Sequence, residues 1–439
     1  MKTQSALFAL LAVGAFLSGP ASAQTSQTLN LHDAEQIAIQ NHPRIQAAVN
    51  LAAAAQAQVT QARSAYYPVA YGSLTGADAE NNSRLAAGNL NSPRVFDKYS
   101  NGLTVEQLVT DFGRTHELVK SSNQHAKAQQ ENIVTTREDV LLQVDRGYFA
   151  VLRAQAVLTV AEQTVKARQL VSDQVTELEK NKIRSGLDVS FANVDLAQGQ
   201  LLLIQAQNDL QASFAQLSAA LGYADERTFH LAEEPLPPTP PADVTVLIQQ
   251  ALRDRPELIG QRFDVRSAQN YATAERDLWF PTISAVGAAG LTPVVGEGGL
   301  SPSTQSTLAP RYAAAGFNVN IPIFNGHLFG ALRTEATQQA QAQNQYLRDL
   351  QDRIVRDVRT AWLNANSAFQ RLSVTDQFLN QANQSLDLAQ SRYKLGLSSI
   401  IELSQAQLNQ TQAQIEQASA KYDYETQISA LNYQLGALH

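Results

Sequence analysis

The sequence predicts a mainly α-helical protein with a small β part, in which long antiparallel helical hairpins occur twice. Three observations indicate this fold. Apolar residues recur at intervals of three and four along polar stretches, short segments alternate apolar and polar residues, and landmarks of the first half recur in the second. The chain of 439 residues is long enough for two or three ordinary domains, but the repeat favours one unit built twice.

The clearest helical hairpin lies in the second half of the chain. From about Gly326 its apolar positions follow the spacing of a coiled-coil seam, and they include Leu347, Leu350, Ile354, Val358, Ala361, Ala365, Ala368, Leu372, Leu379, Ala382, Leu386, Ala389 and Tyr393. The pattern stops at Gly396 and restarts towards about Gly436. Because glycine readily adopts the left-handed conformation that ends a helix, we expect the hairpin to reverse at Gly396.

Landmarks of the first half recur in the second half in the same order and at nearly constant spacing. The matched pairs are Pro43 with Pro256, Pro68 with Pro281, Gly113 with Gly326, Gly186 with Gly396, and Gly222 with Gly436. Five ordered pairs indicate a duplication. The mature chain therefore divides into a first repeat (24–222), a Pro-rich linker placed at the equator of the helices (223–243) and a second repeat (244–439).

Each repeat is expected to contain the same series of elements. In the first and second repeat respectively, they are a short helix (Leu31–Asn41, Val244–Asp254), a helix that begins at a proline (Pro43–Tyr66, Pro256–Trp279), a strand pair (about 67–112, about 280–325) and a helical hairpin (tip near 186, tip near 396). Proline is favoured in the first turn of a helix, so it separates the two short helices of each repeat.

The first 23 residues have the pattern of a secretory signal peptide. Lys2 provides the charged start, Ala6–Leu17 the apolar segment, and Ala21-Ser22-Ala23 the small-residue cleavage site. The rest of the chain contains no run of about 20 apolar residues, and the chain has no cysteine. We therefore expect an exported protein without disulfides and without a transmembrane helix.

The strand segments indicate contact with a membrane. Phe317, Val319, Ile321 and Ile323 alternate with Asn318, Asn320 and Pro322, so one side of this strand is apolar and the other is polar. Each segment is close to the 9–11 residues with which a tilted strand crosses a bilayer. The stretches that connect the strands, Asp78–Lys98 and Leu291–Arg311, are rich in Asn, Ser, Gly and Pro and are expected to be exposed loops.

Four strands cannot close a barrel in lipid, because the open edges would leave backbone groups unpaired. The smallest single-chain barrels need about eight strands. If these strands lie in a membrane, the chain must oligomerise, and three copies would give a shared 12-stranded transmembrane β-barrel above an α-barrel of hairpins. Closure alone also permits a dimer. The alternative to a membrane sheet is a soluble β-hairpin attached to a coiled-coil protein.

The composition argues against several other classes of function. The formal net charge is −7 and there is no basic cluster, so nucleic acid is not expected as a partner. The seven histidines do not have the spacing of a metal site, and the chain has neither a phosphate-binding glycine loop nor a nucleophile elbow. We therefore expect no enzyme activity, no metal and no cofactor.

Motifs at the reversals and strand ends carry a family resemblance. They are Ser391-Arg392-Tyr393-Lys394-Leu395-Gly396-Leu397 followed by Ile401-Glu402-Leu403, a poorer copy at Lys182-Ile183-Arg184-Ser185-Gly186-Leu187, the aromatic-proline pairs at the strand entries, and Ile321-Pro322-Ile323-Phe324-Asn325-Gly326. In this order they resemble the TolC-like outer-membrane efflux proteins. The resemblance covers essentially the whole mature chain and rests on the order and duplication of the motifs.

The resemblance implies a homotrimeric conduit with a β-barrel in outer-membrane lipid and an α-barrel in the periplasm of a Gram-negative bacterium. It also implies that the tips dock a periplasmic adaptor (membrane fusion) protein, which is tied to an inner-membrane pump. The docking residues so implied are Arg184, Gly186, Leu187, Lys394, Gly396 and Leu397. The alternative interpretation is that the glycines only end helices.

The resemblance further implies a pore constriction just past the tips, formed by Tyr393 and the acids Asp195 and Glu402. Three copies of either acid would form a negative ring that favours cations. The pattern is incomplete, because the position equivalent to Glu402 is Ala192 and the position equivalent to Asp195 is Gln405. The alternative is that both acids lie on solvated helix faces, where exposed charges have little effect.

The hypothesis that combines these observations is the outer-membrane channel of a tripartite efflux or type I secretion system. Such a channel would be a passive exit duct across the periplasm and the outer membrane. The alternative hypothesis is a soluble periplasmic coiled-coil structural protein, which would carry the same helical seams but no membrane sheet.

Overall fold

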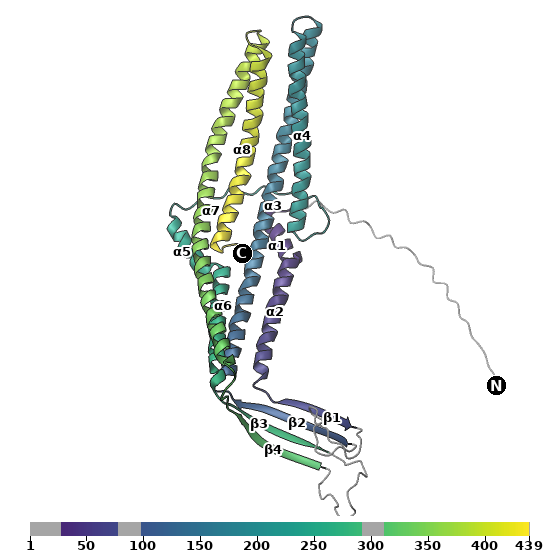
Figure 1. Cartoon of the computed structure of the whole chain (residues 1–439). Helices are drawn as coiled ribbons and strands as arrows, with labels where there is room; N and C mark the ends of the chain where they lie inside the picture. Colours follow the sequence, from purple (N-terminus) through teal and green to yellow (C-terminus); the bar gives the residue numbers. More distant parts are fainter. Residues whose placement is uncertain (1–27, 78–97, 292–310, 439) are drawn as a thin grey trace, which may run out of the picture.

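The computed structural model describes residues 28–77, 98–291 and 311–438, and the molecule is elongated (Figure 1). A four-stranded sheet lies at one end, and two long helical hairpins reverse at the opposite end. The predicted signal peptide (1–23) lies outside the described residues, as do most of the two predicted loops.

The helices follow the predicted order. They are α1 (Leu31–Asn41), α2 (Pro43–Ser64), α3 (Arg114–Lys180), α4 (Gly186–Ala220), α5 (Val244–Asp254), α6 (Pro256–Arg276) with the short 3₁₀ helix η2 (Asp277–Trp279), α7 (Leu328–Lys394) and α8 (Ile400–Leu435). Helices α3 and α7 have 67 residues each, which is about 100 Å at 1.5 Å per residue. Helices α4 and α8 return only part of the way, and α2 and α6 occupy the remaining length beside α3 and α7 (Figure 1).

The coiled-coil seam predicted for α7 is the side of that helix that is buried. Ile354, Val358, Ala361, Ala365 and Ala368 are all buried, and the seam continues through further positions at intervals of three and four towards the tip. Small side chains at these positions let the α8 helix pack closely, and the same alternation of three and four residues is the geometry of left-handed coiled coils.

The sheet is an antiparallel meander in the order β1-β2-β3-β4. The strands are β1 (Val69–Ala77), β2 (Lys98–Thr110), β3 (Thr282–Leu291) and β4 (Arg311–Asn320). Strand β4 begins at Arg311, which the sequence placed in a loop, and it ends before Ile321, which the sequence placed in the strand. Pro322 lacks the amide that a strand residue would donate, and Ile323 is 88% exposed.

The register of the strands separates apolar from polar residues. Directly paired residues share a face of the sheet. Leu103 pairs with Ala289 and Phe317 with Ala285, so these four lie on one face together with Val319. The opposite face carries polar side chains, which are Thr104, Glu106, Ser284, Asn318 and Asn320. The sheet therefore has one apolar face and one largely polar face, as the alternation predicts.

Exposed aromatic side chains gather where the helices meet the sheet. Phe112 and Phe280 have ring centroids 6.0 Å apart, and Trp279 packs against Phe329 at 5.8 Å. Phe112, Trp279 and Phe280 are each about half exposed, and Phe324 is more so. Aromatic rings with this placement are typical of the boundary between a membrane and water.

Each half has an apolar core where its hairpin meets its short helix. In the first half, Ala38 of α1 packs with Val144 of α3 and Leu217 of α4. In the second half, Ala251 of α5 packs with Ile354 of α7. The two cores are equivalent in the duplicated fold, and they lie at the same level along the helices.

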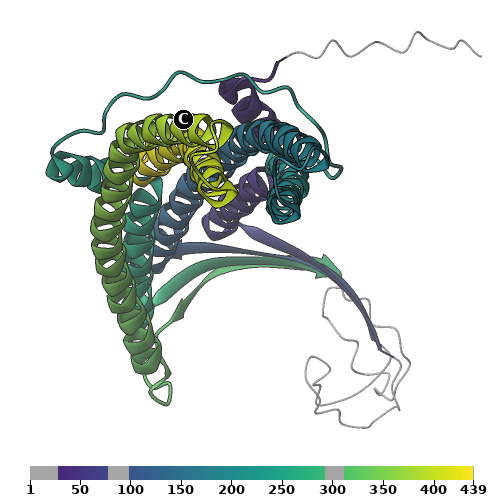
Figure 2. The ribbon, with the colours of Figure 1, turned by 90° about the horizontal axis from the view of Figure 1, so that it is seen from above.

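The linker (223–243) crosses the outer side of the helices between α4 and α5 (Figure 2). Its many prolines lack amide donors but keep their carbonyl acceptors. Aromatic side chains of the helices donate to carbonyls of the linker, with bonds from Tyr148 Oη to Ala232 O (2.6 Å), from Tyr424 Oη to Pro238 O (2.6 Å) and from Trp362 Nε1 to Pro241 O (2.7 Å). These bonds hold the extended linker against the helices.

Candidate functional site

The first reversal lies between the end of α3 and the beginning of α4. Lys182 has a left-handed conformation (φ 58°), and the amide of Ile183 donates to the carbonyl of Leu178 (2.8 Å), which is the Schellman end of a helix. The hydroxyl of Ser185 accepts from the amide of Asp188, and the carboxylate of Asp188 accepts from the amide of Ser185, each at 3.2 Å. This capping box fixes the beginning of α4.

The second reversal has the same geometry. Gly396 is left-handed (φ 73°), and the amide of Leu397 donates to the carbonyl of Arg392 (2.9 Å). The hydroxyl of Ser399 then accepts from the amide of Glu402 (3.4 Å) at the beginning of α8. The prediction that Gly396 reverses the chain in a left-handed conformation is therefore confirmed.

The structure corrects the sequence pairing of Gly186 with Gly396. The left-handed residue of the first reversal is Lys182, whereas Gly186 is the first residue of α4 and has no positive φ. Asp188 lies six residues after Lys182, and Glu402 lies six residues after Gly396. The two acids therefore occupy equivalent places in the two reversals. Asp188 was not predicted as a tip residue, because the reversal was expected at a glycine. A serine followed three residues later by an acid is the signal that would have found it.

Arg184 links the tips of the two hairpins, beside a buried apolar cluster of Val175, Ala192, Tyr393, Ile400 and Leu403. Arg184 Nη2 donates to the carbonyl of Tyr393 (2.6 Å), and its guanidinium lies over the Tyr393 ring, 4.3 Å from the centroid. Tyr393 is 7% exposed, and burial raises the pKa of its hydroxyl, which has no hydrogen-bond partner among the described residues. A cation stacked on a desolvated aromatic ring contributes about 1–2 kcal/mol. Arg184 and Tyr393 therefore hold the two tips together.

The two acids predicted for the constriction both have partners. The carboxylate of Asp195 accepts a hydrogen bond from Ser404 Oγ of α8, and its backbone carbonyl accepts from Arg168 Nη1 (2.7 Å). Asp195 is half-buried between the hairpins. Glu402 is more exposed and forms an ion pair with Arg392 Nε of α7 (3.1 Å). Glu402 is therefore the more accessible of the two carboxylates.

The far end of the tips exposes apolar side chains. Leu187 is 65% exposed and Leu397 is 68% exposed, and Ile183 and Leu395 beside them are also exposed. Lys394 is exposed next to this group. Clustered exposed apolar residues at the end of a coiled coil indicate an interaction surface.

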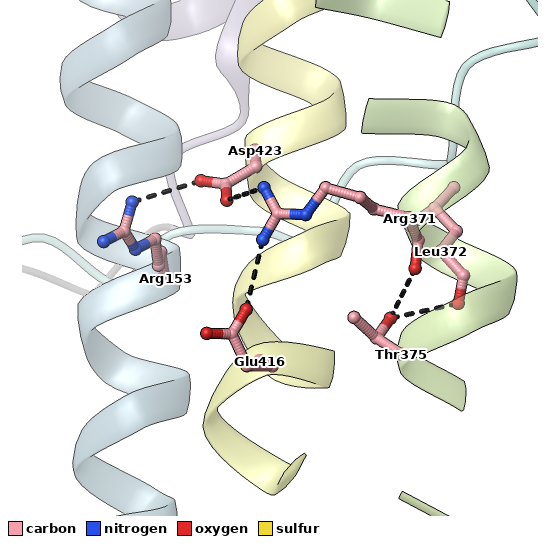
Figure 3. A network of polar contacts seen from close by, with 6 residues as sticks. All are labelled: Arg153, Arg371, Leu372, Thr375, Glu416 and Asp423. Atoms are coloured by element: carbon pink, nitrogen blue, oxygen red, sulfur yellow. Dashed lines mark hydrogen bonds and ion pairs between the residues drawn. The ribbon is translucent and has the colours of Figure 1, made fainter. Parts of the chain in front are cut away.

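A polar network connects the hairpins nearer the equator (Figure 3). Asp423 of α8 accepts from Arg153 Nη1 of α3 (3.1 Å) and pairs with Arg371 Nη1 of α7 (3.5 Å). Arg371 Nη2 also pairs with Glu416 of α8 (3.1 Å), and Thr375 Oγ1 donates to the carbonyl of Arg371 (2.9 Å). The network thus joins α3 of the first hairpin to both helices of the second.

Metal-binding clusters and membrane-spanning helices are both absent from the described residues. Within residues 28–77, 98–291 and 311–438, no group of three or more His, Asp or Glu residues is arranged to hold a metal ion. In the same ranges, none of the helices is both long enough and apolar enough to cross a membrane.

An open sheet with one apolar face, joined to long hairpins that end in exposed apolar tips, is the arrangement of a membrane-channel subunit. The model of the family described as Outer membrane efflux protein matches residues 35–223 and 247–437. The chain belongs to this family. The match also has two segments, one in each repeat, as the duplication predicts.

Curated relatives match nearly the whole chain. The Outer membrane protein TolC of Salmonella enteritidis is 24% identical over 440 residues, which cover 97% of this chain and 85% of the relative. The Alkaline protease secretion protein AprF of Pseudomonas aeruginosa is 23% identical over 419 residues, which cover 93% and 85%. Membership of this family confirms the predicted outer-membrane location and the general function in efflux, and it opposes the alternative of a soluble structural protein.

Solved structures confirm the fold. The outer-membrane channel OprN has a TM-score of 0.79 at 19% identity, with 93% of this chain and 90% of that chain covered. The outer membrane protein VceC of Vibrio cholerae has a TM-score of 0.77 at 17% identity, with 92% and 96% covered. These similarities extend to the whole arrangement of hairpins and sheet.

Proposed function

We propose that three copies of the chain assemble into a passive duct that carries exported molecules across the periplasm and the outer membrane. The observation that supports this most directly is the open sheet. Strands β1 and β4 are its two edges, and each has a partner on one side only within the described residues. In lipid each unpaired backbone group costs several kcal/mol, so the edges must pair with other copies. Three copies give a barrel of twelve strands.

The apolar face of the sheet supports contact with outer-membrane lipid. Leu103, Phe317 and Val319 lie on this face and are more than half exposed in a single chain. Polar residues on the other face would line an aqueous pore, as in other transmembrane barrels. The aromatic residues where the helices meet the sheet would then lie at the periplasmic boundary of the membrane.

The exposed tips support docking of a periplasmic adaptor that connects the duct to an inner-membrane pump. Leu187 and Leu397 would provide apolar contacts, and Arg184 and Lys394 lie beside them. A Cβ added at Gly186 or Gly396 would meet no atom of the described residues within 4 Å, so a partner can approach the backbone there. The proposed division into repeats 24–222 and 244–439 with the linker 223–243 gives each repeat one tip.

The same assembly supports a constriction formed by Tyr393, Asp195 and Glu402 of three chains. Exported drugs, ions or polypeptides would pass through it, and no chemical step would be needed. Tyr393 and Asp195 lie where the two hairpins of one chain meet, so the constriction would open only if those contacts were broken.

Disulfide trapping between β1 and β4 tests the assembly, because the chain has no cysteine of its own. Ser73→Cys is combined in turn with Ala314→Cys, Gly316→Cys or Asn318→Cys, which lie on the same face of the sheet. Within one chain β1 and β4 are separated by two strands, roughly 14 Å, which is beyond the reach of a disulfide. A bond can therefore form only between copies.

At least one of the three double variants is expected to give covalent dimers and trimers on a non-reducing gel after mild oxidation. The control combines Ser73→Cys with Phe317→Cys, which lies on the opposite face and is expected to remain uncoupled. Monomers in all three variants, or dimers without trimers, would contradict the proposed assembly.

A further inference from the structure

A cavity lies at the equator between the linker and the helices. Its volume is about 520 Å³, which is within the range of small-molecule sites. We call it the equatorial cavity, and it is lined by residues of α1, α3, the linker, α5, α8 and the C-terminal segment. Most of its wall is apolar and is formed by five linker prolines together with Leu31, Phe149, Leu247, Ile428, Leu431, Leu435 and Leu438.

The polar part of the wall is acidic. Four carboxyl groups line the cavity, which are Glu35 of α1, Asp145 of α3, Glu234 of the linker and Glu425 of α8. Among the residues that the structure describes, no lysine, arginine or histidine lines it. The nearby cation Lys421 forms an ion pair with Glu233 and also favours the ionised form of Glu425, but it is not among the residues that line the cavity. The lining thus gathers negative charge from four elements.

Two of these carboxyl groups are deeply buried, and three of their four oxygens lack a hydrogen-bond partner among the described residues. Asp145 and Glu425 are each 1% exposed. Both carboxylate oxygens of Glu425 lack a hydrogen-bond partner in the described part of the chain, and so does Oδ1 of Asp145. Buried polar atoms are almost always hydrogen-bonded, so such atoms on a cavity wall point to a missing ligand.

The other two carboxyl groups, those of Glu234 and Glu35, have hydrogen-bond partners. Glu234 Oε1 accepts from the amide of Leu31 (3.0 Å) at the beginning of α1, where negative charge is favoured. Glu35 shares a hydrogen bond with Asp145, which also bonds with Ser429. Burial raises the pKa of both Glu35 and Asp145, and the two neighbouring carboxyl groups share one proton rather than both being ionised.

We propose that the equatorial cavity binds a small organic cation, in which an amidinium or ammonium group lies beside Glu425 and Asp145 and an apolar body lies against the linker prolines. The apolar wall favours an organic cation over a bare metal ion. The residues described also contain no group of three acids or histidines arranged for a metal. The site lies under the linker, away from the tips, and all of its described lining residues belong to one chain.

The buried charge gives this site a pH dependence. Burial raises the pKa of Glu425 to about 7 and that of Asp145 to about 6. The cation pairs with the ionised carboxylates, so protonation in acid competes with binding. Glu233, held ionised by Lys421, also faces Glu425 and does not titrate in this range.

Binding of 4-fluorobenzamidinium to the purified full-length protein in a non-ionic detergent tests the proposal, with ¹⁹F NMR as the readout. The planar amidinium can make paired hydrogen bonds to a carboxylate. The neutral isostere 4-fluorobenzamide measures partition into detergent. Glu425→Gln and Asp145→Asn preserve side-chain shape, and Glu162→Gln removes a carboxylate from an exposed position of α3 outside the cavity.

At pH 8, saturable binding of the amidinium is expected in the wild type and in Glu162→Gln. In Glu425→Gln and in Asp145→Asn, the affinity for the amidinium is expected to be at least tenfold lower. In the wild type, binding should also weaken at least tenfold between pH 8 and pH 5, which is measured without any variant. The proposal is overturned by non-saturable amidinium binding at pH 8, by equal binding of the benzamide, by unchanged binding in both cavity variants, or by competition from Ca²⁺ but not from a second organic cation.

Discussion

Arg184 and Tyr393 join the two tips of one chain, so Arg184 is expected to control how often the tips separate. Arg184→Ala removes a charge-assisted hydrogen bond and a stacked cation, which together contribute about 2 kcal/mol. That loss would shift the balance between closed and open tips by roughly 30-fold. Single-channel recording in planar bilayers should show a higher mean conductance for Arg184→Ala than for the wild type.

Tyr393→Phe is the matched control for this prediction. The substitution keeps the ring and the backbone carbonyl that Arg184 contacts, and it removes a hydroxyl that has no partner among the described residues. Conductance should therefore stay at the wild-type value. The proposed role of Arg184 is wrong if Arg184→Ala conducts like the wild type, or if Tyr393→Phe raises conductance equally.

Glu425 is expected to make the stability of the protein depend on pH. Its pKa is raised by burial from 4.5 to about 7, so the folded state binds a proton that the unfolded state has released between these values. Stability should therefore fall as pH rises from about 4.5 to about 7, by on the order of 3 kcal/mol for this group. Glu425→Gln should remove this part of the loss and be more stable than the wild type at pH 8.

Thermal loss of the helical circular dichroism, measured at pH 5 and pH 8, checks this prediction without ligand. The unfolding midpoints of Glu425→Gln and the wild type should lie close together at pH 5 and separate at pH 8. The exposed-site variant Glu162→Gln should follow the wild type at both values. A wild-type midpoint that is equal to that of Glu425→Gln at pH 8 would show that the Glu425 carboxylate finds a partner in solution.

At the scale of elements, the two reversals differ in one residue that matters. Lys182 and Gly396 occupy the same left-handed position, where a side chain is disfavoured by about 1 kcal/mol. Lys182→Gly should therefore stabilise the first reversal by about 0.5–1 kcal/mol, and Gly396→Ala should destabilise the second by a similar amount. Hydrogen exchange of the amides at 178–190 and 392–404 measures each reversal separately.

Gly186→Ala distinguishes the corrected pairing of the reversals from the original one. Gly186 is an ordinary first residue of α4 with open space around its Cα, so alanine should be tolerated there. If instead Gly186→Ala loosened the first reversal as strongly as Gly396→Ala loosens the second, Gly186 rather than Lys182 would be the equivalent of Gly396.

Elements that depend on local patterns were predictable from the sequence. Helices α1 and α5 have the predicted bounds, because the residue after each helix, His42 or Arg255, precedes a proline and is therefore disfavoured in a helical conformation. The alternating residues of β4 located that strand but not its ends, since residues 313–316 are small residues without alternation and Pro322 ends the pairing early. The first reversal was misplaced because a lysine, not a glycine, is left-handed there.

At the scale of the whole molecule, contacts between the repeats had no signal in the sequence. Arg184 and Tyr393 are separated by 209 residues, and so are Asp195 and Ser404. A single sequence shows spacing within a helix, but it does not show which face of one hairpin meets another. The family resemblance could therefore suggest the tips as a site. Only the structure shows that Asp195 accepts a hydrogen bond from the other hairpin, whereas Glu402 pairs with Arg392 of its own hairpin.

In the proposed trimer, the different surroundings of Asp195 and Glu402 should give these two acids different effects on ion selectivity. Three copies of Glu402 would place three carboxylates near the constriction, each beside an arginine, Arg392. Glu402→Gln leaves that arginine unpaired, so the ratio of K⁺ to Cl⁻ permeability in planar bilayers should fall at least twofold, since local charge sets selectivity in a narrow pore. Asp195→Asn should lower the ratio less, because Ser404 and burial shield that carboxylate, and Asp225→Asn at the equator should leave it unchanged. A ratio that is insensitive to both Glu402→Gln and Asp195→Asn would remove these acids from the constriction while leaving the rest of the duct intact.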